Sequence, residues 1–150
     1  LTYMLDIVEE PKEGDKILEI GTGSGYQAAV LSILGAEVFT VEIIPDLAIE
    51  AKARLKILDY PRIHTKIDDG YHGWKEHAPF NGIIVTAAPD HVPNTLLSQL
   101  SNNGKLIIPV GPQGQVQTLW EIKRNEDSWI SINQGAVRFV PFTRKITKEN

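Results

Sequence analysis

The sequence predicts an α/β fold with a doubly wound, mainly parallel sheet and an antiparallel hairpin at one edge. Through residues 1–110, short apolar runs alternate with segments of helical periodicity, which is typical of βαβ units around a parallel sheet. A glycine-rich turn follows the first of these runs directly. Beyond residue 110 the helical segments give way to alternating runs around a polar stretch, which indicates the hairpin.

The first half of the chain contains the predicted glycine turn and its flanking elements. Apolar residues at Leu1, Met4, Leu5 and Val8 have helical spacing, so a helix is expected to stop before residue 11. Proline and aspartate at 45 and 46 suit the first turn of a later helix. The expected order is a strand over 16–20, a helix over 26–34, a strand over 37–41 and a helix over 45–58.

The second half supplies the rest of the predicted sheet. Apolar and β-branched runs bounded by turn residues predict its strands. The polar stretch over 124–128 is expected to join the two strands of the hairpin. The expected strands cover residues 62–67, 82–87, 105–110, 116–123, 129–132 and 136–142, with a short helix over 93–100.

Bulk composition indicates one globular domain over residues 1–150 and excludes several classes of function. The chain is 42% hydrophobic and 23% charged, with a net charge of −4, which disfavours non-specific nucleic-acid binding. No apolar run approaches the roughly 20 residues of a membrane span. The absence of cysteine removes thiolate chemistry and fits the cytoplasm. The four histidines lack the spacing of a metal site, so no metal is expected. Because a helix is already under way at Leu1, we expect a fragment or a processed chain.

A glycine turn over residues 21–25 is the strongest functional signal. It joins a buried strand to a helix, and in open α/β sheets ligands bind at this end of the first strand. A dinucleotide site needs its third glycine one residue later than Gly25. Glu19 would also face a pyrophosphate unfavourably, whereas a carboxylate suits a ligand with a cationic amino group. The turn therefore favours S-adenosylmethionine over NAD.

Two acidic positions extend the predicted cofactor site. Glu42 ends the second strand, 21 positions after Gly21, and a carboxylate at about that spacing can accept both ribose hydroxyls of an adenosine. Asp69 and Gly70 follow the third strand beside the same crevice, where a carboxylate could accept from the adenine amine. By themselves these two residues are only a turn signal, so this interpretation depends on the glycine turn and Glu42.

These motifs resemble the protein-L-isoaspartate O-methyltransferase family, whose members have a Rossmann-like fold. The resemblance covers essentially the whole chain. The cofactor motif is shared with many methyltransferases, whereas the TAAP run and the VRFVP ending are more specific. The similar runs are LEIGTGSGYQAA over 18–29, IVTAAP over 84–89, GKLIIPVG over 104–111 and VRFVPF over 137–142.

The resemblance implies roles for individual residues. Gly21, Thr22 and Gly23 would cradle the methionine part of S-adenosylmethionine, and Glu42 would take the ribose. Residues expected at or near the adenosyl group are Ile43, Asp69, Gly70, Tyr71 and Thr143. The walls of the isoaspartyl-peptide site are expected to be Thr86, Ala87, Ala88, Val137, Arg138, Phe139 and Val140.

Some positions depart from the family pattern. Asp68 stands where a glycine is usual and His91 where an acidic residue is common, and neither affects the main inference. Relatives also carry an N-terminal segment with a Gln-Thr-Ile-Ser-like motif at the reacting carboxylate. Nothing in residues 1–150 matches it, so no catalytic residue is assigned here.

The implied reaction is methyl transfer to the free α-carboxylate of L-isoaspartyl residues in damaged proteins, which initiates their repair. A carboxylate is already ionised at neutral pH, so no general base is required. Isoaspartyl peptides and proteins are thus the expected partners, with no nucleic acid or membrane. Two alternatives stay open: a methyltransferase acting on RNA or a small metabolite, and a cofactor-binding fragment without turnover.

Overall fold

The computed structural model describes residues 11–60 and 62–145. The helix predicted over residues 1–8 lies outside this part of the chain. Within it, no helix is both long enough and apolar enough to cross a bilayer.

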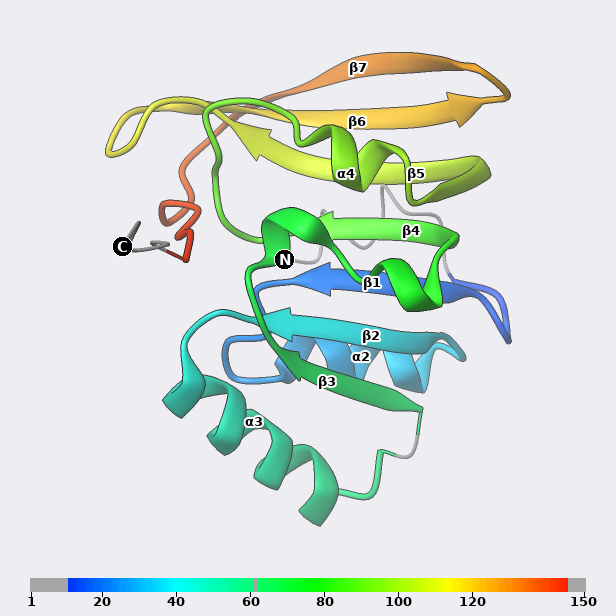
Figure 1. Cartoon of the computed structure of the whole chain (residues 1–150), viewed down its shortest axis with the longest axis vertical. Helices are drawn as coiled ribbons and strands as arrows, with labels where there is room; N and C mark the ends of the chain where they lie inside the picture. The colour runs from blue at the N-terminus through cyan, green and yellow to red at the C-terminus, as the bar shows by residue number, and fades with distance from the viewer. Residues whose placement is uncertain (1–10, 61, 146–150) are drawn as a thin grey trace, which may run out of the picture.

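The described residues form one seven-stranded sheet in the order β3-β2-β1-β4-β5-β6-β7 (Figure 1). The pairs from β3 across to β5 are parallel, and the pairs β5–β6 and β6–β7 are antiparallel. This arrangement confirms the predicted parallel sheet with a hairpin at one edge. The strands are β1 (Lys16–Ile20), β2 (Glu37–Glu42), β3 (Ile63–Ile67), β4 (Phe80–Val85), β5 (Leu100–Val110), β6 (Gln117–Asn125) and β7 (Ser128–Val137).

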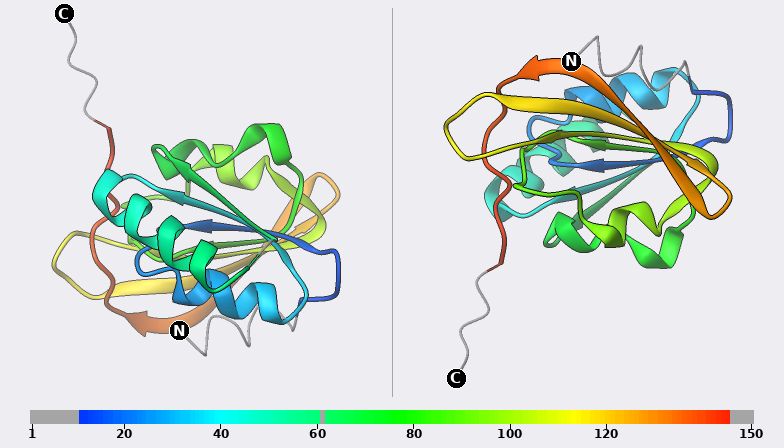
Figure 2. Two further views of the ribbon diagram at one scale, coloured as in Figure 1. Left: turned by 90° about the horizontal axis from the view of Figure 1, so that it is seen from below. Right: turned by 90° about the horizontal axis from the view of Figure 1, so that it is seen from above.

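Helices cover both faces of the parallel part of the sheet. The helices α2 (Tyr26–Ile33) and α3 (Pro45–Ile57) pack on one face, and α4 (Asn94–Leu97) lies on the other (Figure 2). Two short 3-10 turns, η1 (Gly70–His72) and η2 (Lys75–His77), connect β3 to β4. Pro45 stands in the first turn of α3, where its missing N–H would have had no helical partner.

The core consists of two apolar layers, one on each side of the sheet. Ile17 and Ile84 face Leu31 of α2, whereas their neighbours Leu18 and Ile83 face Leu96 of α4. Successive strand residues point to opposite faces, so a strand covered on both faces is nearly continuously apolar. This explains why β1 and β4 appear in the sequence as short, mainly apolar runs, interrupted in β1 by the buried Glu19.

The largest error of the sequence prediction is the strand over 136–142. In the structure β7 ends at Val137, and the chain then leaves the sheet and crosses the carboxyl ends of the parallel strands (Figure 1). Only a bridge between Ala88 and Pro141 remains. Proline has no N–H for a ladder, and the apolar residues of this segment pack on the core and line a pocket instead.

Other element boundaries also differ from the prediction. The short helix is confined to Asn94–Leu97, because Leu100 already pairs with Phe80 and begins β5. β7 starts at Ser128 and is ten residues long, so the hairpin extends further than its apolar residues indicated.

Candidate functional site

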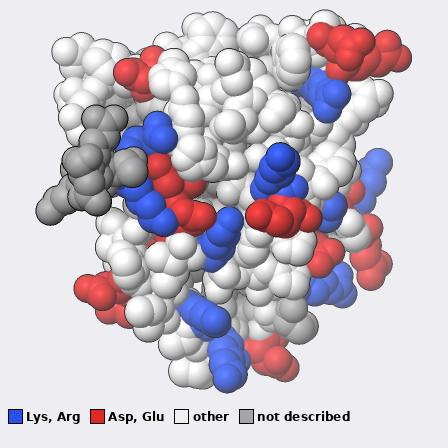
Figure 3. All heavy atoms as spheres, in the orientation of Figure 1, with Lys and Arg blue, Asp and Glu red and all other residues white. Residues whose placement is uncertain are grey.

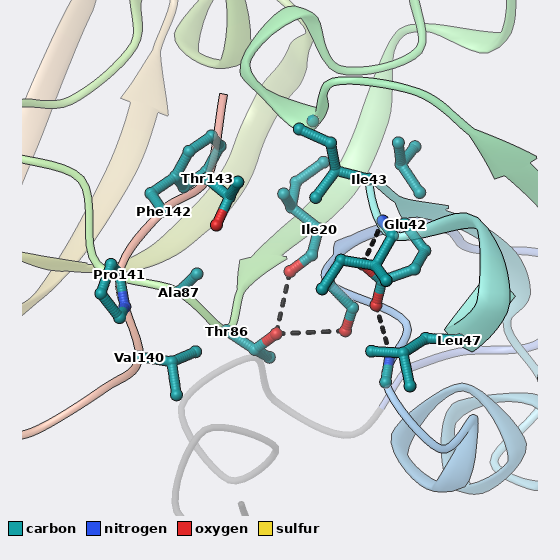
Figure 4. Close-up of a pocket in the computed structure, with 15 residues that line it drawn as sticks. Ile20, Glu42, Ile43, Leu47, Thr86, Ala87, Val140, Pro141, Phe142 and Thr143 are labelled. Atoms are coloured by element: carbon teal, nitrogen blue, oxygen red, sulfur yellow. Dashed lines mark hydrogen bonds between the residues drawn. The ribbon is translucent and has the colours of Figure 1, made fainter. Parts of the chain in front are cut away.

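A pocket of about 400 Å³ opens at the carboxyl ends of β1, β2 and β4 (Figure 4). The glycine turn lies between β1 and α2, and the segment after β7 closes the opposite side (Figures 1 and 4). The lining residues are Ile20, Gly21, Gly23, Val41, Glu42, Ile43, Ile44, Leu47, Gly70, Thr86, Ala87, Val140, Pro141, Phe142 and Thr143.

Gly21 and Gly23 shape the wall of the pocket beneath α2. Both have positive φ, 98° and 54° respectively, which L side chains rarely adopt. A Cβ on Gly21 would lie 2.3 Å from Oγ1 of Thr86, whereas a Cβ on Gly23 would meet nothing within 4 Å. Gly21 is therefore required by the protein's own packing, and Gly23 leaves open space beside the pocket.

Thr86 joins the ends of β4 and β1 at the floor of the pocket. Its backbone N–H donates to the carbonyl of Ile20 at 3.0 Å, and its hydroxyl donates to the same carbonyl at 2.9 Å (Figure 4). The hydroxyl proton is thus used within the protein. The free lone pairs of Oγ1 remain able to accept a hydrogen bond from a ligand.

Glu42 presents its carboxylate at the end of β2. The residue is 7% exposed and lines the pocket. Oε1 accepts from the Gly23 N–H at 2.9 Å and Oε2 accepts from the Ile44 N–H at 3.2 Å. Each carboxylate oxygen has two lone pairs, so one on each oxygen stays available. Two adjacent acceptors fixed by backbone amides fit a vicinal diol such as that of ribose.

Glu19 lies beneath the glycine turn and does not line the pocket. It is fully buried, and Oε1 accepts from the Thr40 hydroxyl, which lies 2.6 Å from that of Thr22. Burial raises the pKa of Glu19 to about 8, against the lowering effect of its hydrogen bond with Thr40. The carboxyl is therefore mainly protonated at neutral pH. Its expected role opposite a cationic amino group stays a prediction.

The carboxylate of Asp69, which is expected near the adenosyl group, points away from the pocket toward the segment after β7. Oδ1 accepts from the Tyr71 N–H at 3.0 Å, and Oδ2 accepts from Nε of Arg144 at 2.8 Å and from the Lys145 N–H at 3.2 Å. The residue is 3% exposed and is not among the pocket residues. Of the neighbouring residues Asp69, Gly70 and Tyr71, which are expected near the adenosyl group, Gly70 alone lines the pocket.

Some of the remaining expected site residues line the pocket and others lie outside its lining. Ile43 and Thr143 line the pocket, as do Thr86, Ala87 and Val140. The other expected residues of the peptide site and of the glycine turn lie outside the lining; these are Thr22, Ala88, Val137, Arg138 and Phe139.

Sequence reasoning missed the apolar lining beside Glu42 and in the last segment. Ile44 and Leu47 are 46% and 39% exposed although both are large and apolar. Pro141 and Phe142 lie across the pocket from Leu47 (Figure 4). The available signal was Ile43 and Ile44 standing after a strand and before Pro45. Apolar residues there have no core to enter.

Figure 3 shows how the charged side chains of the described residues are distributed on one face of the molecule. Among the described residues of that face, basic and acidic side chains are interspersed, and neither sign forms an extended patch.

The protein-family model described as protein-L-isoaspartate(D-aspartate) O-methyltransferase matches residues 1–147. The chain belongs to this family. It is 50% identical over 137 residues to the protein-L-isoaspartate O-methyltransferase of Gloeobacter violaceus and 54% identical over 127 residues to that of Picosynechococcus. These matches cover 91% and 84% of this chain but 67% and 56% of the relatives.

Solved structures of the family have the same fold. A structure titled protein-L-isoaspartate O-methyltransferase superposes with a TM-score of 0.86 at 29% identity, over 93% of this chain and 45% of that one. A putative family member from Plasmodium falciparum, in complex with S-adenosyl-L-homocysteine, gives 0.80 at 25% identity, over 97% and 72%. An rRNA methylase from Streptococcus thermophilus, at 14% identity and a TM-score of 0.59, shares the fold alone.

Proposed function

We propose that this chain binds S-adenosylmethionine in the pocket between the glycine turn and the segment after β7. Family membership supports the cofactor, as does the S-adenosyl-L-homocysteine named for the Plasmodium falciparum structure. The observation that carries the proposal is Glu42, whose carboxylate is fixed by two backbone amides and keeps one free lone pair on each oxygen at the pocket.

The rest of the pocket fits the parts of this cofactor. Ile43 and the adjoining apolar residues offer a surface for the adenine ring, and Gly70 leaves its edge accessible. The open space above Gly23 suits the methionine part. We assign Thr22 and Glu19 a supporting role, because their hydrogen-bonded chain through Thr40 lies directly beneath the turn.

We further propose that the chain is the cofactor-binding part of an enzyme that methylates the α-carboxylate of L-isoaspartyl residues. Bound S-adenosylmethionine would supply the methyl group of its sulfonium to the carboxylate oxygen, with a C–O bond formed as the C–S bond breaks and S-adenosylhomocysteine as the leaving group. No proton transfer is needed, because the nucleophile is already ionised. The residues of the site therefore act by alignment and by exclusion of water.

Thr86, Ala87 and Val140 form the part of the pocket that we assign to the isoaspartyl side chain. The free lone pairs of the Thr86 hydroxyl can accept from a peptide N–H. Arg138 is exposed beside the lining, and we assign it to the peptide that flanks the reacting residue. The other three expected residues would support this wall from behind, because Ala88 is buried and Val137 and Phe139 pack on the core. The TAAP and VRFVP runs favour a protein substrate over RNA. The absence of cysteine favours a cytoplasmic location.

Binding is tested by calorimetry with S-adenosylhomocysteine and the variant Glu42→Ala. Hydrogen bonds to a charged acceptor contribute roughly 1.5–3 kcal/mol each, so the dissociation constant should rise at least about tenfold. Glu37→Ala is a matched control, because Glu37 is at the opposite end of the same strand and pairs with exposed His64. Unchanged affinity in Glu42→Ala would place the ribose elsewhere.

Turnover is tested with an isoaspartyl peptide and its normal aspartyl counterpart, using this chain and, as a positive control, its relative from Gloeobacter violaceus. Both proteins should methylate the isoaspartyl peptide and leave the aspartyl peptide unlabelled. Equal labelling of the two peptides, or labelling of RNA, would refute the substrate assignment. Cofactor binding by this chain without turnover, beside an active relative, would favour the alternative of a cofactor-binding chain that does not turn over.

A further inference from the structure

The segment over residues 138–145, called the strap here, crosses the carboxyl ends of the parallel strands (Figures 1 and 2). Val140, Pro141, Phe142 and Thr143 all line the pocket from this segment. In Figure 4 they stand opposite Glu42 and Leu47. One wall of the pocket is therefore made by a segment that lies outside the regular strands and helices.

Hydrogen bonds from backbone N–H groups, to one side-chain oxygen and two carbonyls, hold the first part of the strap. The Phe139 N–H donates to Oε1 of Gln117 at 2.8 Å. The Ala88 N–H donates to the carbonyl of Val140 at 2.8 Å, and the Phe142 N–H returns to the Ala88 carbonyl at 3.1 Å. These hydrogen bonds fix the strap as far as Phe142. Residues 143–145 are held by a second set of contacts.

The second anchor is formed by charged side chains. Oδ2 of Asp69 accepts from Arg144 and from the backbone of Lys145, whose Nζ lies 2.7 Å from Oδ1 of Asp68. The guanidinium of Arg144 lies 3.6 Å from the centroid of the Tyr71 ring. The hydroxyl of Tyr71 forms a hydrogen bond with Nε2 of His91 at 2.9 Å. Arg144 is thus held by a carboxylate on one side and an aromatic face on the other.

The environment of Asp69 explains why its carboxylate turns toward the strap. Its side chain is 4% exposed, and a carboxylate buried without a partner is strongly unfavourable. Burial would raise the pKa of Asp69, but the hydrogen bonds from Arg144, Tyr71 and Lys145 outweigh it and lower that pKa. Three donors occupy the carboxylate, two of them on Oδ2 from the strap, and one lone pair of Oδ1 stays free.

Given the proposed cofactor site, we propose that Asp69 is a positioning residue that fixes the strap through Arg144 and Lys145. It thereby holds Thr143 and the strap wall against the adenosyl group. Asp69 and Arg144 act as one unit in this view. Loss of either should release the end of the strap to the same extent.

The first test needs no ligand. Hydrogen–deuterium exchange is measured by mass spectrometry over residues 138–145 in the wild type, Asp69→Asn, Arg144→Gln and the double variant. Each single variant should accelerate exchange of the strap at least about fivefold while β4 exchanges as in the wild type. Arg62→Gln is the control, because Arg62 is half-exposed and its partners Glu13 and Gly35 lie at the other end of the sheet. Strap exchange unchanged in both Asp69→Asn and Arg144→Gln would overturn the proposal.

The second test measures affinity for S-adenosylhomocysteine in the same proteins. Asp69→Asn and Arg144→Gln should each weaken binding about fivefold, and the double variant should be no weaker than either single one, because coupled residues are not additive. Arg144→Lys keeps the charge and should recover part of the affinity. If Asp69→Asn alone weakens binding and Arg144→Gln does not, Asp69 contacts the ligand directly and the proposal is wrong. If the wild type binds no S-adenosylhomocysteine, the proposed function is refuted. The hydrogen–deuterium exchange result still shows whether Asp69 and Arg144 fix the strap.

Discussion

Replacing Glu19 by glutamine should change how the stability of this chain depends on pH. The pKa of Glu19 is raised to about 8 in the folded chain from the ordinary value of 4.5, because the carboxyl is fully buried beneath the glycine turn. Folding therefore favours the protonated form. The stabilisation is complete below pH 4.5 and is lost as the pH rises through about 8.

The size of the effect follows from the two pKa values. Each pH unit between them corresponds to about 1.4 kcal/mol, so ionisation of Glu19 opposes folding by up to about 5 kcal/mol above pH 8. That is comparable with the whole free energy of unfolding of a marginal domain, roughly 5–15 kcal/mol. Glutamine cannot ionise, so Glu19→Gln lacks this pH dependence and should gain stability relative to the wild type as pH rises.

Urea denaturation followed by circular dichroism at pH values between about 5 and 8 measures the difference. The free energy of unfolding of the wild type should fall relative to Glu19→Gln by about 1.4 kcal/mol per pH unit. Other titrating groups are common to both proteins and cancel. Glu13→Gln is the control, because the Glu13 side chain is 86% exposed. Parallel curves for the wild type and Glu19→Gln would show that Glu19 is ionised at neutral pH and refute the reasoning.

Two further predictions concern the glycine turn and the core. Gly21→Ala should destabilise the chain more than Gly23→Ala, because both positions have positive φ but only the former brings a Cβ to 2.3 Å from Oγ1 of Thr86; thermal unfolding of the two variants checks this, and equal losses would contradict it. Leu106→Ala should lower the free energy of unfolding by about 2–5 kcal/mol, because Leu106 is fully buried in the central strands. A loss below about 1 kcal/mol in urea denaturation would mean that the site collapses around the smaller side chain.

The sequence was sufficient for those features that leave a local pattern. β1, β4 and the turn between β1 and α2 were predictable because a strand buried on both faces is nearly continuously apolar and a tight turn requires glycine. The placement of Glu42 at the pocket followed from the end of β2. These features depend on neighbours within about 20 positions along the chain.

The strap and the orientation of Asp69 could not be predicted in this way. Arg144 meets Asp69 across 75 positions, and a charged pair at that separation leaves no local pattern. Alternation of apolar residues around Pro141 predicts a strand whether the alternate side chains face a core or a ligand pocket. Distinguishing the two requires the position of Ala88, which pairs with Pro141 in the fold.

The strand order has a consequence for how the pocket forms during folding. β1 pairs with β4, so the segments that meet at the pocket come from both halves of the chain, from Ile20 to Thr143. Contacts of such long sequence separation form slowly, since loop closure must precede them. The pocket is therefore complete only when both halves of the chain have folded together. A ligand bound there bridges both halves and, by mass action, should stabilise the sheet as a single cooperative unit against global unfolding.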